Sequence, residues 1–460
     1  MKKSTENLLF KLPVFLQNTA LSIYGLYLNF ERHRGTFRPS LETALQHLKF
    51  SNNDLESYII NQIRKTITEA GQYVPYYRSV FRKNIVSPEM DIHSAGDLIK
   101  IPLLNKEVIR REPFSLVDER YKKKLLCLHT TGTTGTPLNI FCNRAARQIN
   151  YAYYSRFLMQ HGIDPEGSRA TLGGRIIVPP EQKSPPFWRY SYFQKNLLFS
   201  SYHLTENNIP CYIDKIVQFK PEYIDSYPSS IYLIADYALR NNYDLKNVTK
   251  GITTSAETLY SWQRKIIEKA FGVPVIDQYG SAEMCNFVAQ CHLGRYHIHS
   301  DYALIEFLRE DGTPADPGEE AEIVCTGFIN PVMPLIRYRI GDYGILSDIP
   351  CKCGSPFPVM EKILGRMDDI IITPDGRKVG RLSPVLKGFP IKESQYIQKK
   401  IDELEVLIVK DKHYDKNTES EVVKELEKRL GTSLKIRVKY VSCIQREKGG
   451  KLRTVISYIK

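Results

Sequence analysis

No uninterrupted apolar run of about 18 residues occurs in the sequence, so we expect no membrane-spanning helix. Internal repeats and low-complexity tracts are also absent, and 27 glycines plus 26 prolines in 460 residues exclude a collagen-like or broadly disordered chain. Lysine and arginine exceed aspartate and glutamate by 64 − 51 = 13, but these cations are spread along the chain. The sequence therefore predicts no nucleic-acid partner, and its basic surface suits a substrate that carries phosphates.

A regular, even set of cysteines is lacking as well, because the nine cysteines are irregularly spaced. This pattern is typical of a reducing compartment, and we expect a cytoplasmic location. Polar residues interrupt the apolar stretch 12–28 and no small-residue cleavage site follows it, so we expect no secretion signal. We interpret residues 9–30 as an amphipathic helix packed on the body, with peripheral membrane contact as the alternative. The oligomeric state is left open.

Hydrophobic periodicity predicts an α/β fold for most of the chain. Residues 53–71 carry the single apolar stripe of a helix, which Asp54 can cap and Gly71 can end. A helical pattern at residues 261–271 precedes a β-rich run at residues 273–277, and this alternation is typical of α/β domains. From about residue 300 the pattern becomes strand-rich.

The C-terminal part reads as a separate small α+β unit. Thr418 and Glu421 form a candidate capping box for a helix that Gly431 closes, and β-rich runs flank this helix. We therefore expect a large N-terminal domain of residues 1–365, with mixed sheets in several subdomains, and a small C-terminal domain of residues 366–460.

The most informative segment is the glycine- and threonine-rich run His129–Pro137. Its two glycines keep the backbone open and its five threonines supply hydroxyl groups, so the loop can wrap a phosphate. It is not a Walker A motif, because no lysine follows the second glycine in the required place. Taken alone, the run also fits a polar surface turn.

Four further segments carry groups suited to nucleotide chemistry: Asp277–Glu283, Arg337–Asp342, Gly365–Asp369 and Gly449–Arg453. A carboxylate that follows a parallel strand lies where α/β sheets bind ligands, and Glu283 can hold Mg²⁺ against phosphate oxygens. Asp342 can accept both hydroxyls of a ribose. Lys451 stands in a mobile glycine turn. Each segment alone also fits a solvated loop.

A separate cysteine–histidine pattern lies in the strand-rich part at about residues 285–360. Cys291 and His297 form one clip, and Cys351 with Cys353 forms a second, which makes a tetrahedral zinc site plausible. Four protein ligands close the shell, so we interpret the zinc as structural. The alternative fourth ligands are His299, His292 and Cys285. Scattered reduced cysteines remain the plain alternative, and a catalytic zinc is a weaker one.

The order and spacing of the five nucleotide segments resemble the adenylate-forming (acyl-AMP) ligase superfamily. Within it the chain is most similar to the phenylacetate–CoA ligase branch, in particular to CapK-type proteins of capsular polysaccharide gene clusters. The segments that carry this likeness are Val74–Tyr77, Pro185–Tyr190, Tyr227–Leu233, Thr254–Glu257 and Pro374–Leu382. The resemblance runs from about residue 13 to the end. It implies a large adenylation domain and a mobile C-terminal lid.

The resemblance also implies a role for each matching residue. The ATP-binding set is Thr130, Thr131, Gly132, Thr133, Thr134, Gly135 and Thr136 at the phosphates, Ser255, Ala256, Glu257, Asp277, Gln278, Tyr279, Gly280 and Ser281 around the adenine and its neighbourhood, and Asp342 at the ribose. Arg366 would reach the ribose or a phosphate, Glu283 would take Mg²⁺, Asp368 sits at the hinge position, and Lys451 would bridge the attacking carboxylate and the α-phosphate. Ala282 departs from the threonine that many members carry, so one hydroxyl contact to the α-phosphate is in doubt.

The expected function is ATP-dependent activation of a carboxylic acid, followed by acyl transfer to CoA or to an amine. The small-molecule acid is unidentified; His203, Tyr227 and Pro228 are weak candidates for its pocket, and a surface position is the alternative for His203. A role in surface polysaccharide biosynthesis fits the branch. The competing hypothesis is a catalytically silent scaffold, against which the intact Glu283 and Lys451 speak.

Overall fold

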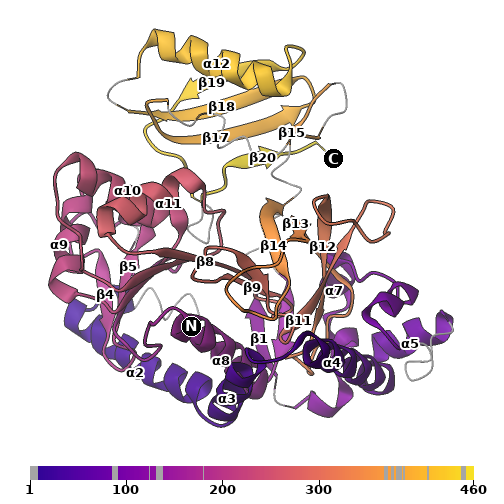
Figure 1. The fold of residues 1–460 in the computed structure, drawn as a ribbon. Helices are drawn as coiled ribbons and strands as arrows, with labels where there is room; N and C mark the ends of the chain where they lie inside the picture. The colour runs from indigo at the N-terminus through magenta and orange to yellow at the C-terminus, as the bar shows by residue number, and fades with distance from the viewer. Residues whose placement is uncertain are drawn as a thin grey trace.

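The computed structural model describes residues 9–84, 92–123, 125–130, 138–179, 181–366, 371–374, 378–379, 386, 389–411, 414–446 and 452–459. One twelve-stranded sheet, with the strand order β11-β12-β13-β14-β10-β9-β8-β7-β6-β3-β5-β4, runs through the large part (Figure 1). Its strands are β3 (Arg169–Gly173), β4 (Trp188–Ser191), β5 (Asn196–Ser200), β6 (Tyr223–Ser226), β7 (Gly251–Thr254), β8 (Val275–Gly280), β9 (Phe287–Gln290), β10 (Tyr296–Ile298), β11 (Ala303–Leu308), β12 (Glu320–Gly327), β13 (Tyr338–Ser347) and β14 (Val359–Arg366). The predicted mixed α/β fold is thereby confirmed.

The sheet changes character at β8. Strands β5, β3, β6, β7 and β8 pair in parallel, whereas β8 through β14 pair antiparallel. The helices of the large part are α2 (Val14–His33), α3 (Phe37–His47), α4 (Asn52–Tyr73), α5 (Pro75–Lys83), α7 (Lys106–Arg111), α8 (Arg144–Gln160), α9 (Ile209–Phe219), α10 (Pro228–Arg240) and α11 (Ser261–Phe271). A hairpin of β1 (Leu126–His129) and β2 (Asn139–Cys142) stands apart from the large sheet. Since parallel strands need crossover connections, helices cover both faces of the parallel half.

The two faces of the parallel half differ in chemistry. Helices α9, α10 and α11 cover one face, with Ala170 and Leu172 of β3 packed in the apolar core beneath them (Figure 1). The alternating residues Arg169, Thr171 and Gly173 are only half-buried and belong to the opposite face, toward α8 and α2. Because these polar residues are covered by helices but remain half-buried, this face of the sheet is a candidate place for a ligand.

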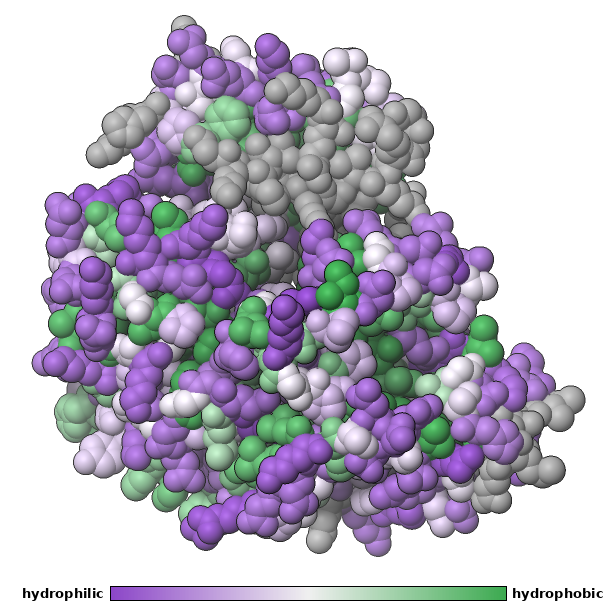
Figure 2. Space-filling model, viewed as in Figure 1, coloured by the Kyte–Doolittle hydropathy of each residue, from purple (hydrophilic) through white to green (hydrophobic). Residues whose placement is uncertain are grey.

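Helix α2 confirms the helix predicted near the N-terminus. It packs on β4, where Gln17 accepts a hydrogen bond from Arg189 at 2.7 Å. Gly25 permits the close approach, because a Cβ there would lie 2.3 Å from Ser191 Oγ. The outer side exposes Phe15, Ile23, Tyr24, Tyr27 and Phe30, and Figure 2 shows apolar side chains along the lower edge of this face, where α2 lies. No helix among the described residues has the length and hydropathy needed to cross a membrane.

Three predicted helix ends are wrong, and two of them belong to α4. Helix α4 continues through Gly71 to Tyr73 and ends where Val74 is extended ahead of Pro75. Its N-cap is Ser51, whose hydroxyl accepts from the Asp54 amide at 3.2 Å.

The capping box predicted for the C-terminal helix is also shifted. Helix α12 (Lys416–Leu430) begins after Asp415, which accepts from the Thr418 amide at 2.8 Å, so Thr418 occupies the third helical position and Glu421 takes no part in the cap. Gly431 closes the helix, as predicted.

The C-terminal unit, meaning the described residues from 371 onward, has its own sheet and core. Strands β19 (Lys435–Tyr440), β18 (Glu403–Lys410), β17 (Ile391–Lys400) and β20 (Val455–Ser457) form the sheet in that order, and α12 packs on it. A two-stranded ladder of β15 (Ile371–Ile372) and β16 (Lys378–Val379) precedes them. The unit sits over the α10–α11 side of the large part (Figure 1).

Candidate functional site

The predicted nucleotide segments meet at one edge of the sheet. Strands β6, β7 and β8 run parallel and in step, so their carboxyl ends share one edge, where α/β proteins bind ligands. The segments that follow these three ends are Tyr227–Pro228, Ser255–Glu257 and Ser281–Glu283. The topology therefore brings together residues that are far apart in the sequence.

Glu257 lies between the large part and the C-terminal unit. Its Oε2 accepts from the Ser229 amide at 3.1 Å, and its Oε1 accepts from the Leu452 amide at 2.9 Å. Burial raises the pKa of Glu257, and these two amide donors oppose the rise. Ala256, next to it, has a φ of 69°, a conformation that costs an alanine energy and that is enriched at functional sites.

Asp277 lies within β8 in a buried, hydrogen-bonded position. Thr254 Oγ1 donates to its Oδ1 at 2.5 Å, and the Tyr296 hydroxyl donates to its Oδ2 at 2.6 Å. Burial raises the pKa of Asp277 to about 6, even though both donors favour the carboxylate. Asp277 thus fixes the end of β7 to β8 and to β10 next to the predicted adenine segment.

Two further carboxylates line the antiparallel half of the site. The Tyr279 hydroxyl donates to Asp342 Oδ2 at 2.7 Å, and the Tyr338 hydroxyl donates to Glu283 Oε1 at 3.2 Å. Asp342 and Glu283 are 9% and 8% exposed, so both carboxylates lie almost buried at this part of the site. In the β13–β14 ladder Asp342 stands directly opposite Arg366, whose side chain lies outside the described part.

Several predicted residues fall outside the described residues: Thr131, Gly132, Thr133, Thr134, Gly135, Thr136, Asp368 and Lys451. Thr130 is described, and it closes the base of the loop. Its hydroxyl accepts from the Leu138 amide at 2.9 Å, and its own amide donates to the Leu138 carbonyl at 3.1 Å. The paired β1 and β2 therefore hold the two ends of the phosphate loop together.

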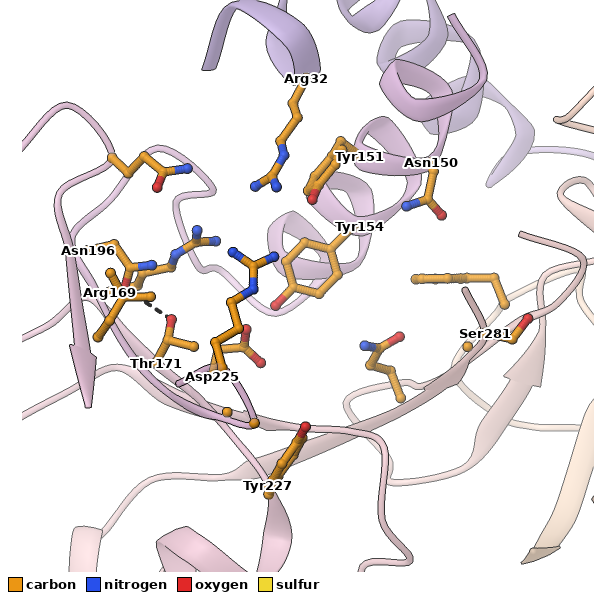
Figure 3. Close-up of a pocket in the computed structure, with 18 of the residues that line it drawn as sticks. Arg32, Asn150, Tyr151, Tyr154, Arg169, Thr171, Asn196, Asp225, Tyr227 and Ser281 are labelled. Carbon is orange, nitrogen blue, oxygen red and sulfur yellow. Dashed lines mark hydrogen bonds between the residues drawn. The ribbon is translucent and has the colours of Figure 1, made fainter. Parts of the chain in front are cut away.

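A cavity of about 540 Å³ opens beside this edge (Figure 3). Tyr227, Gln278, Gly280 and Ser281 line the part next to the nucleotide segments. His203 and Pro228 are not among its described lining residues. His203 is buried rather than on the surface: its Nδ1 lies 2.8 Å from Ser200 Oγ, and its ring stacks on Phe187.

The remainder of the cavity lies on the polar face of the parallel sheet. Its walls carry Arg32 of α2, Tyr154 of α8, and Arg169, Asn196 and Asp225 of the strands (Figure 3). Reasoning from motifs missed these residues. The sequence did carry a signal for them: β3 alternates polar and apolar residues, whereas a parallel strand covered by helices on both faces is usually apolar throughout.

The four predicted zinc ligands gather in one cluster. One side-chain atom each of Cys291, His297, Cys351 and Cys353 lies within 4.8 Å of all the others. The Cys291 and Cys351 sulfurs are 3.8 Å apart, and Cys353 Sγ is 3.3 Å from His297 Nε2. A tetrahedron with Zn–S bonds of about 2.3 Å has sulfur–sulfur edges of about 3.8 Å, so the spacing fits zinc.

The surroundings of the cluster also suit a metal. His297 Nδ1 lies 2.9 Å from the Phe357 carbonyl and donates its proton there, which leaves Nε2 free to face the thiols. The alternative ligand His299 points elsewhere: it contacts Arg156, which is paired with Asp301 at 2.6 Å in a fully buried ion pair. Among the described residues, His297 is therefore the histidine of the cluster.

Comparisons with known proteins give one consistent likeness. A family model described as the CapK C-terminal domain matches residues 371–458. Protein CapK of Staphylococcus aureus is 30% identical over 460 residues, covering 97% of this chain and 98% of that protein. Phenylacetate-coenzyme A ligase of Thermus thermophilus is 25% identical over 362 residues, covering 73% and 74%.

Solved structures share the fold. 2-Hydroxyisobutyryl-CoA ligase in the postadenylation state, in complex with 2-HIB-AMP, superposes with a TM-score of 0.70 at 18% identity, covering 87% of this chain and 89% of that one. The same enzyme in its thioesterification state, with 2-HIB-AMP and CoA, gives a TM-score of 0.57 over the same shares.

Proposed function

Since this chain belongs to the family of protein CapK, which is related to the phenylacetate–CoA ligases, we propose that it is an acid–CoA ligase-like enzyme. It uses ATP to convert a carboxylic acid to an acyl-adenylate with release of pyrophosphate. The acyl group then passes to an acceptor.

One observation carries this proposal: the Leu452 amide binds the Glu257 carboxylate at 2.9 Å. Lys451 directly precedes Leu452 in the sequence, so it would act on the nucleotide from this unit. A lysine delivered by a separate unit is useful during adenylation and can be withdrawn afterwards.

In the first half-reaction, an oxygen of the substrate carboxylate attacks the α-phosphorus of ATP. A P–O bond to that carboxylate forms, the bond from the α-phosphorus to the oxygen bridging the β-phosphate breaks, and pyrophosphate leaves. Both reactants are anionic, so the site must neutralise them where charge develops. The Lys451 ammonium would do this, while Asp342 would hold the ribose and the loop closed by Thr130 would hold the outer phosphates.

Glu283 suits a divalent cation because it is an almost buried carboxylate in the candidate site. Carboxylate oxygens are preferred ligands of Mg²⁺, which would neutralise phosphate charge when bound. Glu257, Ser255 and Asp277 to Tyr279 would flank the adenine.

The acceptor is CoA or an amine. The names of the phenylacetate-coenzyme A ligases favour CoA, and the likeness to CapK leaves room for amide formation in capsular or surface polysaccharide biosynthesis. Residues 366–460 act as the lid that turns between the two half-reactions, about a hinge at Asp368. The separate apolar core of the C-terminal unit supports movement as one body.

The cysteine–histidine cluster would hold a structural zinc ion. Three thiolates and one imidazole complete a tetrahedral shell, so no coordination site remains for a substrate. Bound there, zinc would cross-link the segment that follows β9 to the segment that precedes β14.

The test is pyrophosphate release from ATP with a panel of carboxylic acids, with and without CoA or amines. Glu283→Gln keeps the shape of the side chain and removes its charge, and adenylation should fall by at least ~10²-fold. Lys451→Ala should slow adenylation by a similar ~10²-fold but spare transfer from synthetic acyl-AMP.

Lys424→Ala is the matched control, because this exposed lysine of α12 lies in the same unit. If parent and Glu283→Gln released pyrophosphate equally, the assignment of the cation site would be wrong. If no acid supported pyrophosphate release at all, the silent scaffold would replace the enzyme as the better hypothesis.

A further inference from the structure

The cavity beside the nucleotide edge carries an excess of positive charge. The charged residues among its described lining are Arg32, Arg169, Arg175 and Asp225, which give a net charge of 3 − 1 = +2. A pocket for an aromatic or aliphatic monocarboxylic acid would be walled by apolar side chains. Here arginines occupy the sheet face and the helix that covers it, as Figure 3 shows for Arg32 and Arg169.

The two inner arginines are incompletely satisfied by the protein. The Nε atoms of Arg32 and Arg169 are buried and have no hydrogen-bond partner among the described residues. Arg32 is 6% exposed, and its guanidinium lies over the Tyr151 ring at 4.6 Å. Arg169 Nη1 reaches only the Tyr223 hydroxyl, at 3.4 Å.

Neighbouring acidic groups supply only part of the counter-charge. Burial opposes the charge of Arg169, while Tyr223 and then Asp225 raise its pKa, and Asp225 also interacts with Arg175. Asp225, the acidic residue of the lining, accepts from Thr253 Oγ1 at 3.4 Å. Glu31, next to Arg32 in α2, pairs with Arg147 at 2.8 Å. Burial lowers the pKa of Arg32, and the positive charges of Arg147, Arg175 and Arg169 lower it further. A buried charge is costly unless it is paired, so the cavity is built to receive an anion.

We propose that the carboxylic acid activated by this protein carries a second anionic group, a carboxylate or a phosphate, which Arg32 and Arg169 bind. This inference rests on the proposed function and names its substrate class. The reacting carboxylate lies at the Gly280–Ser281 end of the cavity, where the nucleotide segments begin, and the second anion lies deeper, between α2 and β3. Paired with guanidinium groups, that anion forms charge-assisted hydrogen bonds.

The first experiment compares acids matched in length. Succinate, glutarate and 3-phosphonopropionate are tested against butyrate, valerate and phenylacetate in the pyrophosphate-release assay. The doubly anionic acids should have values of kcat/KM at least ~10-fold higher, the scale of one hydrogen bond to a charged group. Comparison of the carboxylate with the phosphonate acid identifies which anion the arginines prefer.

The second experiment changes Arg32. Arg32→Gln should raise KM for the preferred acid at least ~10-fold and leave KM for ATP unchanged, and Arg32→Lys should restore part of the affinity. Arg38→Gln, an exposed arginine of α3, is the control. Arg169→Gln is a second variant, from a different wall of the cavity, and should act in the same direction.

Binding without turnover separates this inference from the proposed function. The same acids are titrated in the absence of ATP, with the shift in melting temperature as the readout. If monocarboxylic acids were activated as well as the doubly anionic ones, the substrate class would be wrong while the ligase activity stood. If no acid were activated but doubly anionic acids bound in an Arg32-dependent way, the proposed function would fail while the arginine site for a doubly anionic acid remained. No activation and no such binding would overturn it.

Discussion

The contact between Glu257 and Leu452 gives a sharp test of how the two parts cooperate. Glu257→Gln keeps the length of the side chain but leaves one acceptor oxygen for two amide donors, Ser229 and Leu452, which lie at 3.1 and 2.9 Å. The NH₂ group of glutamine must then face one N–H. The lost hydrogen bond to a charged acceptor is worth about 1.5–3 kcal/mol, or roughly 10- to 150-fold in the population of the docked arrangement.

The assay separates the two half-reactions. At saturating ATP, so that any contact of Glu257 with the adenine is not limiting, Glu257→Gln should slow adenylate formation by ~10- to 150-fold. Transfer from synthetic acyl-AMP should change little, because in the proposed mechanism the C-terminal unit turns away before transfer.

Glu206→Gln is the matched control. Glu206 also spans the two parts, through Lys392 at 2.7 Å, but its side chain is 42% exposed. An exposed ion pair contributes about 0–1 kcal/mol, so this variant should be nearly silent. If Glu257→Gln slowed both half-reactions equally, or no more than Glu206→Gln, the Glu257 contact would have no part in adenylation.

Two further predictions concern stability. Metal analysis should find about one zinc per chain. Cys351→Ser should remove the zinc and lower the free energy of unfolding by on the order of 4 kcal/mol, whereas Cys443→Ser, at an exposed cysteine, should do neither. Equal stability of the two variants would argue against a metal. Because burial raises the pKa of Asp277 to about 6, the folded protein binds this proton more tightly than the unfolded chain. The stability contributed by that proton is full below the unfolded pKa of about 3.9 and is lost as the pH rises through about 6. In urea unfolding, Asp277→Asn should therefore gain about 2 kcal/mol over the parent between pH 4 and 7. A difference that stays constant over this range would contradict the shift.

The sequence predicted the elements whose signals are local. The helix at residues 261–271 matches α11 because its apolar spacing, its length and Gly272 at its C-cap all agree. The two wrong helix starts have one cause, a choice between two possible capping residues three positions apart. The true N-caps, Ser51 and Asp415, each lie three residues before the residue that the sequence suggested as the cap. Only the folded backbone shows which side chain accepts the hydrogen bond from the free amide.

The part of the candidate site that is built from sequence motifs in a fixed order was predictable. Glu283, Asp342 and Glu257 stand in recognisable segments, and parallel strands necessarily bring segments that follow them to one edge. The arginine-lined cavity was not predictable in this way. Arg32 and Arg169 are separated by 137 positions of the printed numbering and belong to no motif, and their proximity depends on α2 lying across β4.

The cysteine–histidine cluster is connected through the large sheet to the strands that carry the nucleotide residues. His297 pairs with Val359 of β14 and with Ala289 of β9, and β9 in turn pairs with β8, which carries Asp277. The other end of β14 is Arg366, opposite Asp342. A metal that joins the segments flanking β9 and β14 therefore holds the register of the strands from which the nucleotide residues project. Because this register is also fixed by the ladders themselves, loss of the metal should cost stability before it alters the positions of the reacting groups.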